Sequence, residues 1–171
     1  MAENKQVFSR PSSSPLAPSA ILGFARLLPL TAIIWTPADW LLPMDINQLT
    51  YAINGAVFEV NRVLGPGFLE KVYENALLTE LSNRGLKAEN PVPITVHYKD
   101  NVVGEYTADI LVEEKVILEL KTVESIENVH EAQLLNYLRA TGIQVGLLVN
   151  FRHPKAEIKR MVLDLSENRK I

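Results

Sequence analysis

The run Val116–Lys121, VILELK, limits what this chain can fold into more than any other segment. It is rich in aliphatic and β-branched residues, which is typical of an interior strand of a sheet. Side chains alternate along a strand, so Glu119 and Lys121 share one face about 6.6 Å apart while the aliphatic residues fill the other. A charge is costly to bury unless it is paired or bound. The two residues therefore form a simple ion pair, lie at a strand end that reaches solvent, or belong to a functional site.

A second acid precedes this strand. The segment Val102–Val112 predicts a strand that carries Asp109, and only residues 113–115 separate it from Val116, so the two runs predict an antiparallel hairpin. Asp109 can then approach Glu119. Two carboxylates in a low-dielectric setting repel each other unless one is protonated or a cation neutralises both, and Mg²⁺ favours such oxygen ligands. An aspartate at a bulge or turned toward solvent is the alternative interpretation.

An amphipathic helix is predicted upstream, over Phe68–Arg84, after the break at Gly65-Pro66-Gly67 and before Gly85. Glu70 borders its apolar stripe and can face the sheet. By spacing alone the helix dipole, which favours acids in the first turn, is the better explanation of Glu70. The apolar stripe consists of Leu69, Val72, Tyr73, Ala76, Leu77 and Leu81.

A second amphipathic helix is predicted downstream, over Asn128–Thr141, closed by Gly142. His130, Gln133 and Tyr137 share one face. A lone histidine of this kind is more typical of a surface or capping residue than of a metal ligand. Gln133 lies beside the apolar face, where a partly buried amide needs hydrogen-bond partners.

Taken in order, these residues resemble the GxxExxY proteins, a branch of the PD-(D/E)XK nuclease superfamily. The run Gly67–Tyr73 (GFLEKVY) matches Gly-x-x-Glu-x-x-Tyr, and Asp109, Glu119-Leu120-Lys121 and Gln133 follow in the order of that family. The resemblance spans about Asp45 to Val162. It implies an α/β fold, a three-layer restriction-endonuclease-like core in which helices flank a mixed central sheet.

The same resemblance implies a divalent-metal nuclease that hydrolyses phosphodiester bonds in DNA or RNA. Its implied catalytic residues are Glu70, Asp109, Glu119, Lys121 and Gln133, and Asp109, Glu119 and Glu70 would hold Mg²⁺ or Mn²⁺. Nucleic acid is the implied partner. A second class of function stays open, a non-catalytic module that binds nucleic acid or protein, because a fold does not fix a function.

Composition sets outer limits on these inferences. The chain has 171 residues, of which 47% are hydrophobic, which is enough for one domain with a substantial core. It has no cysteine, so disulfides and thiolate metal sites are excluded, and we expect a cytoplasmic protein. The formal net charge of −3 argues against an indiscriminate nucleic-acid binder.

The first 43 residues differ from the rest of the chain. Arg10–Pro15 has the composition of a loop, and the longest uncharged run, Leu27–Ala38, is too short to span a bilayer. Asp45 and Gln48 have the spacing of a capping box and open a helical stripe. We therefore expect residues 1–43 to be a disordered extension or a mis-assigned start, and residues 44–171 to be the nuclease-like domain. Exposed apolar surface on the first helix is compatible with a homodimer.

Three further elements complete the expected domain. Pro91–Lys99 predicts the first strand of a three-strand meander, and Gln144–Phe151 predicts a buried strand. Lys155–Leu165 predicts a closing helix.

Overall fold

The computed structural model describes residues 44–163. Its helices are α1 (Ile46–Leu64), α2 (Glu70–Asn83) and α3 (Asn128–Thr141). Its strands are β1 (Ala88–Glu89), β2 (Val92–Tyr98), β3 (Asn101–Ala108), β4 (Ile110–Val112), β5 (Val116–Lys121), β6 (Val145–Asn150) and β7 (Glu157–Val162). The expectation about residues 1–43 falls outside the described residues. No helix within residues 44–163 combines the length and apolar character needed to cross a membrane.

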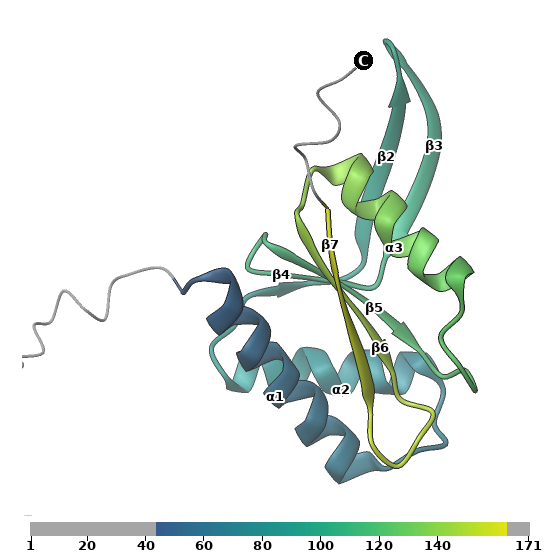
Figure 1. Cartoon of the computed structure of the whole chain (residues 1–171). Helices are drawn as coiled ribbons and strands as arrows, with labels where there is room; N and C mark the ends of the chain where they lie inside the picture. The colour runs from purple at the N-terminus through teal and green to yellow at the C-terminus, as the bar shows by residue number, and fades with distance from the viewer. Residues whose placement is uncertain (1–43, 164–171) are drawn as a thin grey trace, which may run out of the picture. The chain divides into compact units, whose positions relative to one another are not determined.

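A five-stranded mixed sheet forms the middle layer, in the order β1-β4-β5-β6-β7 (Figure 1). β5 and β6 are parallel, whereas the other neighbours are antiparallel. Parallel strands require a crossover, which α3 supplies between β5 and β6. The mixed sheet with flanking helices confirms the predicted fold class.

Two hydrophobic clusters lie on opposite faces of this sheet. On one face α1 and α2 pack against Leu118 and Leu120 of β5, and on the other face α3 packs against Ile117. Because side chains alternate along β5, Glu119 and Lys121 share the α3 face with Ile117. The predicted buried strand is confirmed as well, since every residue of β6 is buried.

β2 and β3 form a separate two-stranded sheet that projects from the core beside α3 (Figure 1). The predicted single strand over Val102–Val112 is therefore wrong, because it is interrupted at Asp109, and so is the meander within one sheet. Alternation alone cannot reveal the interruption. The apolar residues of β3 are largely exposed, including Val102, Val103 and Tyr106, and burial resumes at Ala108.

The predicted closing helix is also wrong. Glu157–Val162 is the edge strand β7, antiparallel to β6. Ile158 and Met161 are spaced like one face of a helix. Pairing of this segment with β6 decides the outcome, because it satisfies backbone groups along the edge of β6 that would otherwise lack partners. The backbone N–H of Leu163 extends the attachment by donating to the Gln144 carbonyl at 2.8 Å.

The helices follow the predicted patterns closely. Asp45 caps α1 in a capping box with Gln48, and α3 has the predicted bounds, with Gly142 left-handed at φ 74°. The stripe of α2 needs a correction. Leu69 and Val72 are exposed, whereas the acid Glu74 is buried with Tyr73, Leu77 and Leu81.

Tyr73 fixes the loop that precedes α2. Its ring stacks on Phe151 with centroids 4.4 Å apart. Its hydroxyl donates to the Gly65 carbonyl at 2.7 Å and accepts from the Phe68 N–H at 3.3 Å. The loop and the first turn of α2 are thereby tied to the core.

Replacing Tyr73 with Phe keeps the stacked ring and removes both loop hydrogen bonds. We expect this variant to lose about 1–2 kcal/mol of unfolding free energy in chemical denaturation, because a part-buried carbonyl loses its partner. The matched control is Tyr51→Phe, on a side chain that is 82% exposed. Equal stability of the two variants would contradict this account of the loop.

Candidate active site

Strand β5 carries two charged side chains at its carboxyl end. Glu119 is 2% exposed, and one of its carboxylate oxygens, Oε1, accepts from Lys121 Nζ at 2.8 Å. The other oxygen, Oε2, is buried without a hydrogen-bond partner. A buried carboxylate oxygen that lacks a donor costs free energy unless a proton or a cation binds to it.

The interruption between β3 and β4 brings Asp109 to this strand. β4 pairs with β5 so that Ile110 lies opposite Leu118, and Asp109 directly precedes Ile110. The Asp109 side chain accepts from the Leu120 N–H through Oδ2 at 2.7 Å. The predicted hairpin is confirmed, and it brings Asp109, Glu119 and Lys121 together.

Burial governs the electrostatics of these three groups. It raises the pKa of Glu119 to about 7, and the charge of Asp109 adds to this effect while Lys121 opposes it. Burial also raises the pKa of Asp109, against the hydrogen bond from Leu120 and the charge of Lys121. Burial by itself lowers the pKa of Lys121, but its hydrogen bond to Glu119 and the nearby carboxylates raise that pKa overall. The site therefore favours bound positive charge.

Glu70 and Gln133 occupy the surroundings of this cluster. Glu70 is the first residue of α2 and is exposed, and its Oε1 accepts from the Thr122 N–H at 3.0 Å, one residue beyond Lys121. Gln133 is half-buried on α3 and donates to the Tyr137 hydroxyl at 2.8 Å, on its own helix. His130 accepts from the Glu127 N–H, so of the two roles expected for it, surface or capping residue, it has the capping one.

Glu74 and Asn90 support Asp109 and were missed by sequence reasoning. The Asn90 amide donates to Glu74 Oε1 and to the Asp109 carbonyl, each at 2.6 Å, and Lys71 also pairs with Glu74. This chain of contacts holds the backbone at the point where β3 ends. The sequence feature that could have indicated this role is the position of Glu74, between Tyr73 and Leu77 of the apolar stripe.

Asn150 was also missed. It is completely buried at the end of β6, where its amide donates to the Val123 carbonyl at 2.8 Å and accepts from the Val123 N–H at 3.1 Å. The next residue, Phe151, donates its N–H to the Lys121 carbonyl at 2.8 Å. Together these contacts fix the backbone that follows β5. The sequence feature that could have indicated this role is a single amide, Asn150, at the end of an apolar run.

The donors present fit one hard divalent cation. Asp109 and Glu119 supply carboxylate oxygens, the ligands that such ions prefer, and Glu119 Oε2 has no hydrogen-bond partner. Over residues 44–163, no three His, Cys, Asp or Glu side chains are gathered closely enough to form a metal centre by themselves. The arrangement therefore offers two carboxylates, with Glu70 at the edge.

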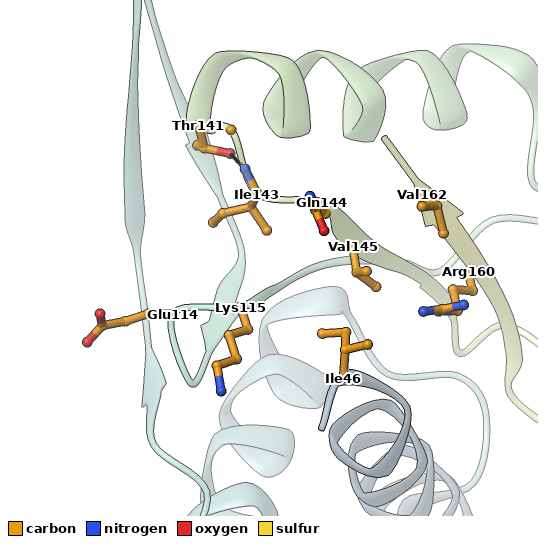
Figure 2. A pocket seen from close by; sticks show the side chains of 10 residues that line it. Ile46, Glu114, Lys115, Thr141, Ile143, Gln144, Val145, Arg160 and Val162 are labelled. Atoms are coloured by element: carbon orange, nitrogen blue, oxygen red, sulfur yellow. Dashed lines mark hydrogen bonds between the residues drawn. The ribbon is translucent and has the colours of Figure 1, made fainter. Parts of the chain in front are cut away.

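A hollow of about 500 Å³ lies elsewhere in the molecule (Figure 2). It is lined by the start of α1, the turn just before β5, the segment from the end of α3 to the start of β6, and β7. Figure 2 shows Lys115 and Arg160 on either side of Ile46. Lys121 and Asn150 are at the opposite ends of β5 and β6. The hollow is therefore separate from the candidate active site.

The pKa of Glu119 predicts a pH response in metal-free protein. The folded-state pKa of about 7 exceeds the ordinary value of 4.5, so protonation favours the folded state. This stabilisation is complete below the unfolded-state pKa and is lost as pH rises toward 7. Between about pH 5 and about pH 7 in EDTA, we expect the unfolding free energy of the wild type to fall by about 2 kcal/mol more than that of Glu119→Gln. Parallel pH curves from urea denaturation would contradict this prediction.

A family model and a protein of known structure both match this chain. The chain is similar to a protein of known structure described as "Crystal structure of SSO0001", with a TM-score of 0.44 and 20% identity over 57% of this chain and 52% of that one. The chain thus spans about half the length of that protein. No curated protein gives a significant match. Residues 47–161 match the family model described as PD-(D/E)XK nuclease superfamily. Because the match covers more than half of the chain, the protein belongs to the PD-(D/E)XK nuclease superfamily.

Proposed function

We propose that this protein is a divalent-metal-dependent nuclease that hydrolyses phosphodiester bonds in DNA or RNA. The observation that carries the proposal is the convergence of Asp109, Glu119 and Lys121 at one strand end, with a buried carboxylate oxygen left without a partner. Within the superfamily we assign the chain to the GxxExxY branch. The contacts of the two signature residues support this assignment. Glu70 ties the Gly67–Tyr73 segment to Thr122, just beyond β5, and Tyr73 fixes the loop that precedes α2.

Asp109 and Glu119 would hold the cation, with Glu70 as a further acid near it. A bound Mg²⁺ or Mn²⁺ would polarise the phosphodiester and lower the pKa of a water molecule. Lys121 has a raised pKa, so it is an ammonium group at neutral pH and acts as a hydrogen-bond donor rather than as a base. From its place beside Glu119 it can stabilise negative charge that develops on the phosphate. Gln133 would have a supporting role from α3.

A non-catalytic binding module is the alternative, and the Lys121–Glu119 ion pair is its one supporting observation. Such a pair neutralises part of the buried charge without any metal. It leaves Asp109 and Glu119 Oε2 unexplained, however, because a scaffold gains nothing from a second acid beside a buried carboxylate. Catalysis therefore accounts for more of the site.

Cleavage of labelled single-stranded and duplex DNA and RNA tests the proposal. With Mg²⁺ or Mn²⁺ we expect cleavage that EDTA stops, and at least about a hundredfold loss of rate in Asp109→Ala and in Lys121→Met, because each removes a group that stabilises the transition state. The matched controls are Asp100→Ala and Lys115→Met, at exposed positions outside the cluster. Metal-dependent cleavage that survives in folded Lys121→Met would refute the role of this lysine. No cleavage of any substrate by folded wild type would favour the binding module.

Metal binding separates the roles of these residues without reference to turnover. By calorimetry with Mn²⁺ we expect one site per chain, weakened at least about tenfold in Asp109→Asn, because the neutral amide is a poorer ligand for a hard cation. Lys121→Met should bind Mn²⁺ as well as the wild type or better, since it removes the cation that competes for Glu119. Weaker binding in Lys121→Met than in Asp109→Asn would contradict the assignment of ligands. The expected cytoplasmic location and homodimer stay predictions.

A further inference from the structure

A groove runs between α3 and the β2–β3 hairpin, on the side of the sheet that carries the candidate active site. It consists of two hollows of about 450 Å³ and about 360 Å³ that share Tyr106 and Asn136. Thr95, Val96, His97, Arg139 and Ala140 complete the first hollow, and Val129, Ala132, Gln133 and Tyr137 complete the second. We call this the α3–hairpin groove.

Tyr106 is the exposed aromatic side chain in the middle of the α3–hairpin groove. It is 53% exposed and rests against Tyr137 with ring centroids 5.9 Å apart at 46°. Gly104, two residues earlier on β3, has no side chain to cover the ring, whereas a Cβ at that position would touch Tyr106 Cε2 at 3.5 Å. The tyrosine is thus supported from one side and open to a planar ligand.

The other side chains of the groove suit a nucleic-acid strand. The lining residues include Arg139, His97 and the amides Asn136 and Gln133, and none of them is a carboxylate. Arg139 donates to Asn136 Oδ1 at 3.2 Å and forms no ion pair among the described residues, so its charge is available to a phosphate. Amides supply both donors and acceptors for base edges.

The position of the groove connects it to the cluster on β5. α3 packs through Leu134, Tyr137 and Leu138 against the face of the sheet that contains Ile117, which is also the face of Glu119 and Lys121. Gln133 lines the groove on the same helix. A strand that follows α3 toward its amino end therefore approaches the end of β5.

Overall charge favours a single strand over a duplex. With a net charge of −3, the chain has little general attraction for phosphates, so stacking must supply much of the affinity. Duplex bases are already stacked inside the helix, whereas those of a single strand are free to stack on an aromatic ring. Building on the proposed nuclease function, we propose that the α3–hairpin groove binds a single-stranded stretch of DNA or RNA with one base stacked on Tyr106.

Fluorescence anisotropy of the full chain in EDTA tests this proposal without cleavage. The probes are fluorescein-labelled oligothymidylate, oligouridylate and the duplex of oligothymidylate with oligoadenylate. We expect tighter binding of a single strand than of the duplex, and about tenfold weaker single-strand binding in Tyr106→Ala, from the loss of one stacked base. Tyr106→Trp should retain affinity.

The matched control is Tyr98→Ala, at the tip of the hairpin, where the side chain is 64% exposed and lies outside the groove lining. We expect it to change affinity less than about twofold, because it would remove no stacking partner in the groove.

Unchanged affinity in folded Tyr106→Ala, an equal loss in Tyr98→Ala, preference for the duplex, or no binding of either single strand would overturn the proposal. The two single strands show whether DNA or RNA is the preferred ligand. Binding that depends on Tyr106 in a protein that cleaves nothing would support the groove and reject the nuclease. Cleavage by the wild type together with unchanged binding in Tyr106→Ala would support the nuclease and reject the groove.

Discussion

The candidate site depends on one constraint, which is that Glu119 is an acid on a strand with neighbours on both sides and helices on both faces. β5 pairs with β4 and with β6, so the position cannot open to water without disrupting the centre of the sheet. Lys121 partners one carboxylate oxygen and leaves the other unpartnered. The surrounding polar contacts, from Asp109 to Asn150, are arranged about this buried charge.

The break at Asp109 joins the two sheets and also supplies the second acid. If the strand continued through this residue, β3 would extend within the central sheet, and no hairpin would project beside α3. The Asn90 amide holds the Asp109 carbonyl, while the Leu120 N–H binds its side chain. The same few atoms therefore hold the Asp109 carboxylate beside β5 and direct the hairpin that forms one wall of the α3–hairpin groove.

Sequence reasoning succeeded where a local pattern and the tertiary structure agree. The alternation and short loop around Val116–Lys121 predicted the β4–β5 hairpin, and the periodicity and Gly142 predicted the bounds of α3. It failed where a distant partner decided the outcome. Glu157–Val162 is a strand because it pairs with the edge of β6. Asn90 has a structural role because it binds the carbonyl of Asp109, 19 positions along the chain. Neither partner can be read from the local pattern.

The two ends of β5 differ in a way that explains why the proposed site lies at only one of them. At the start of the strand, Val116 is buried between two neighbours, and no buried charge requires compensation. At its end, backbone groups of residues 121–123 are held by Phe151, Glu70 and Asn150, which come from α2 and from the end of β6. These contacts from separate elements restrict the backbone on which Lys121 is mounted. A lysine held in this way loses less conformational entropy when it contacts a phosphate than one on a free loop. Rigid support therefore sets Lys121 apart from the exposed lysines of residues 44–163, in keeping with the role proposed for it.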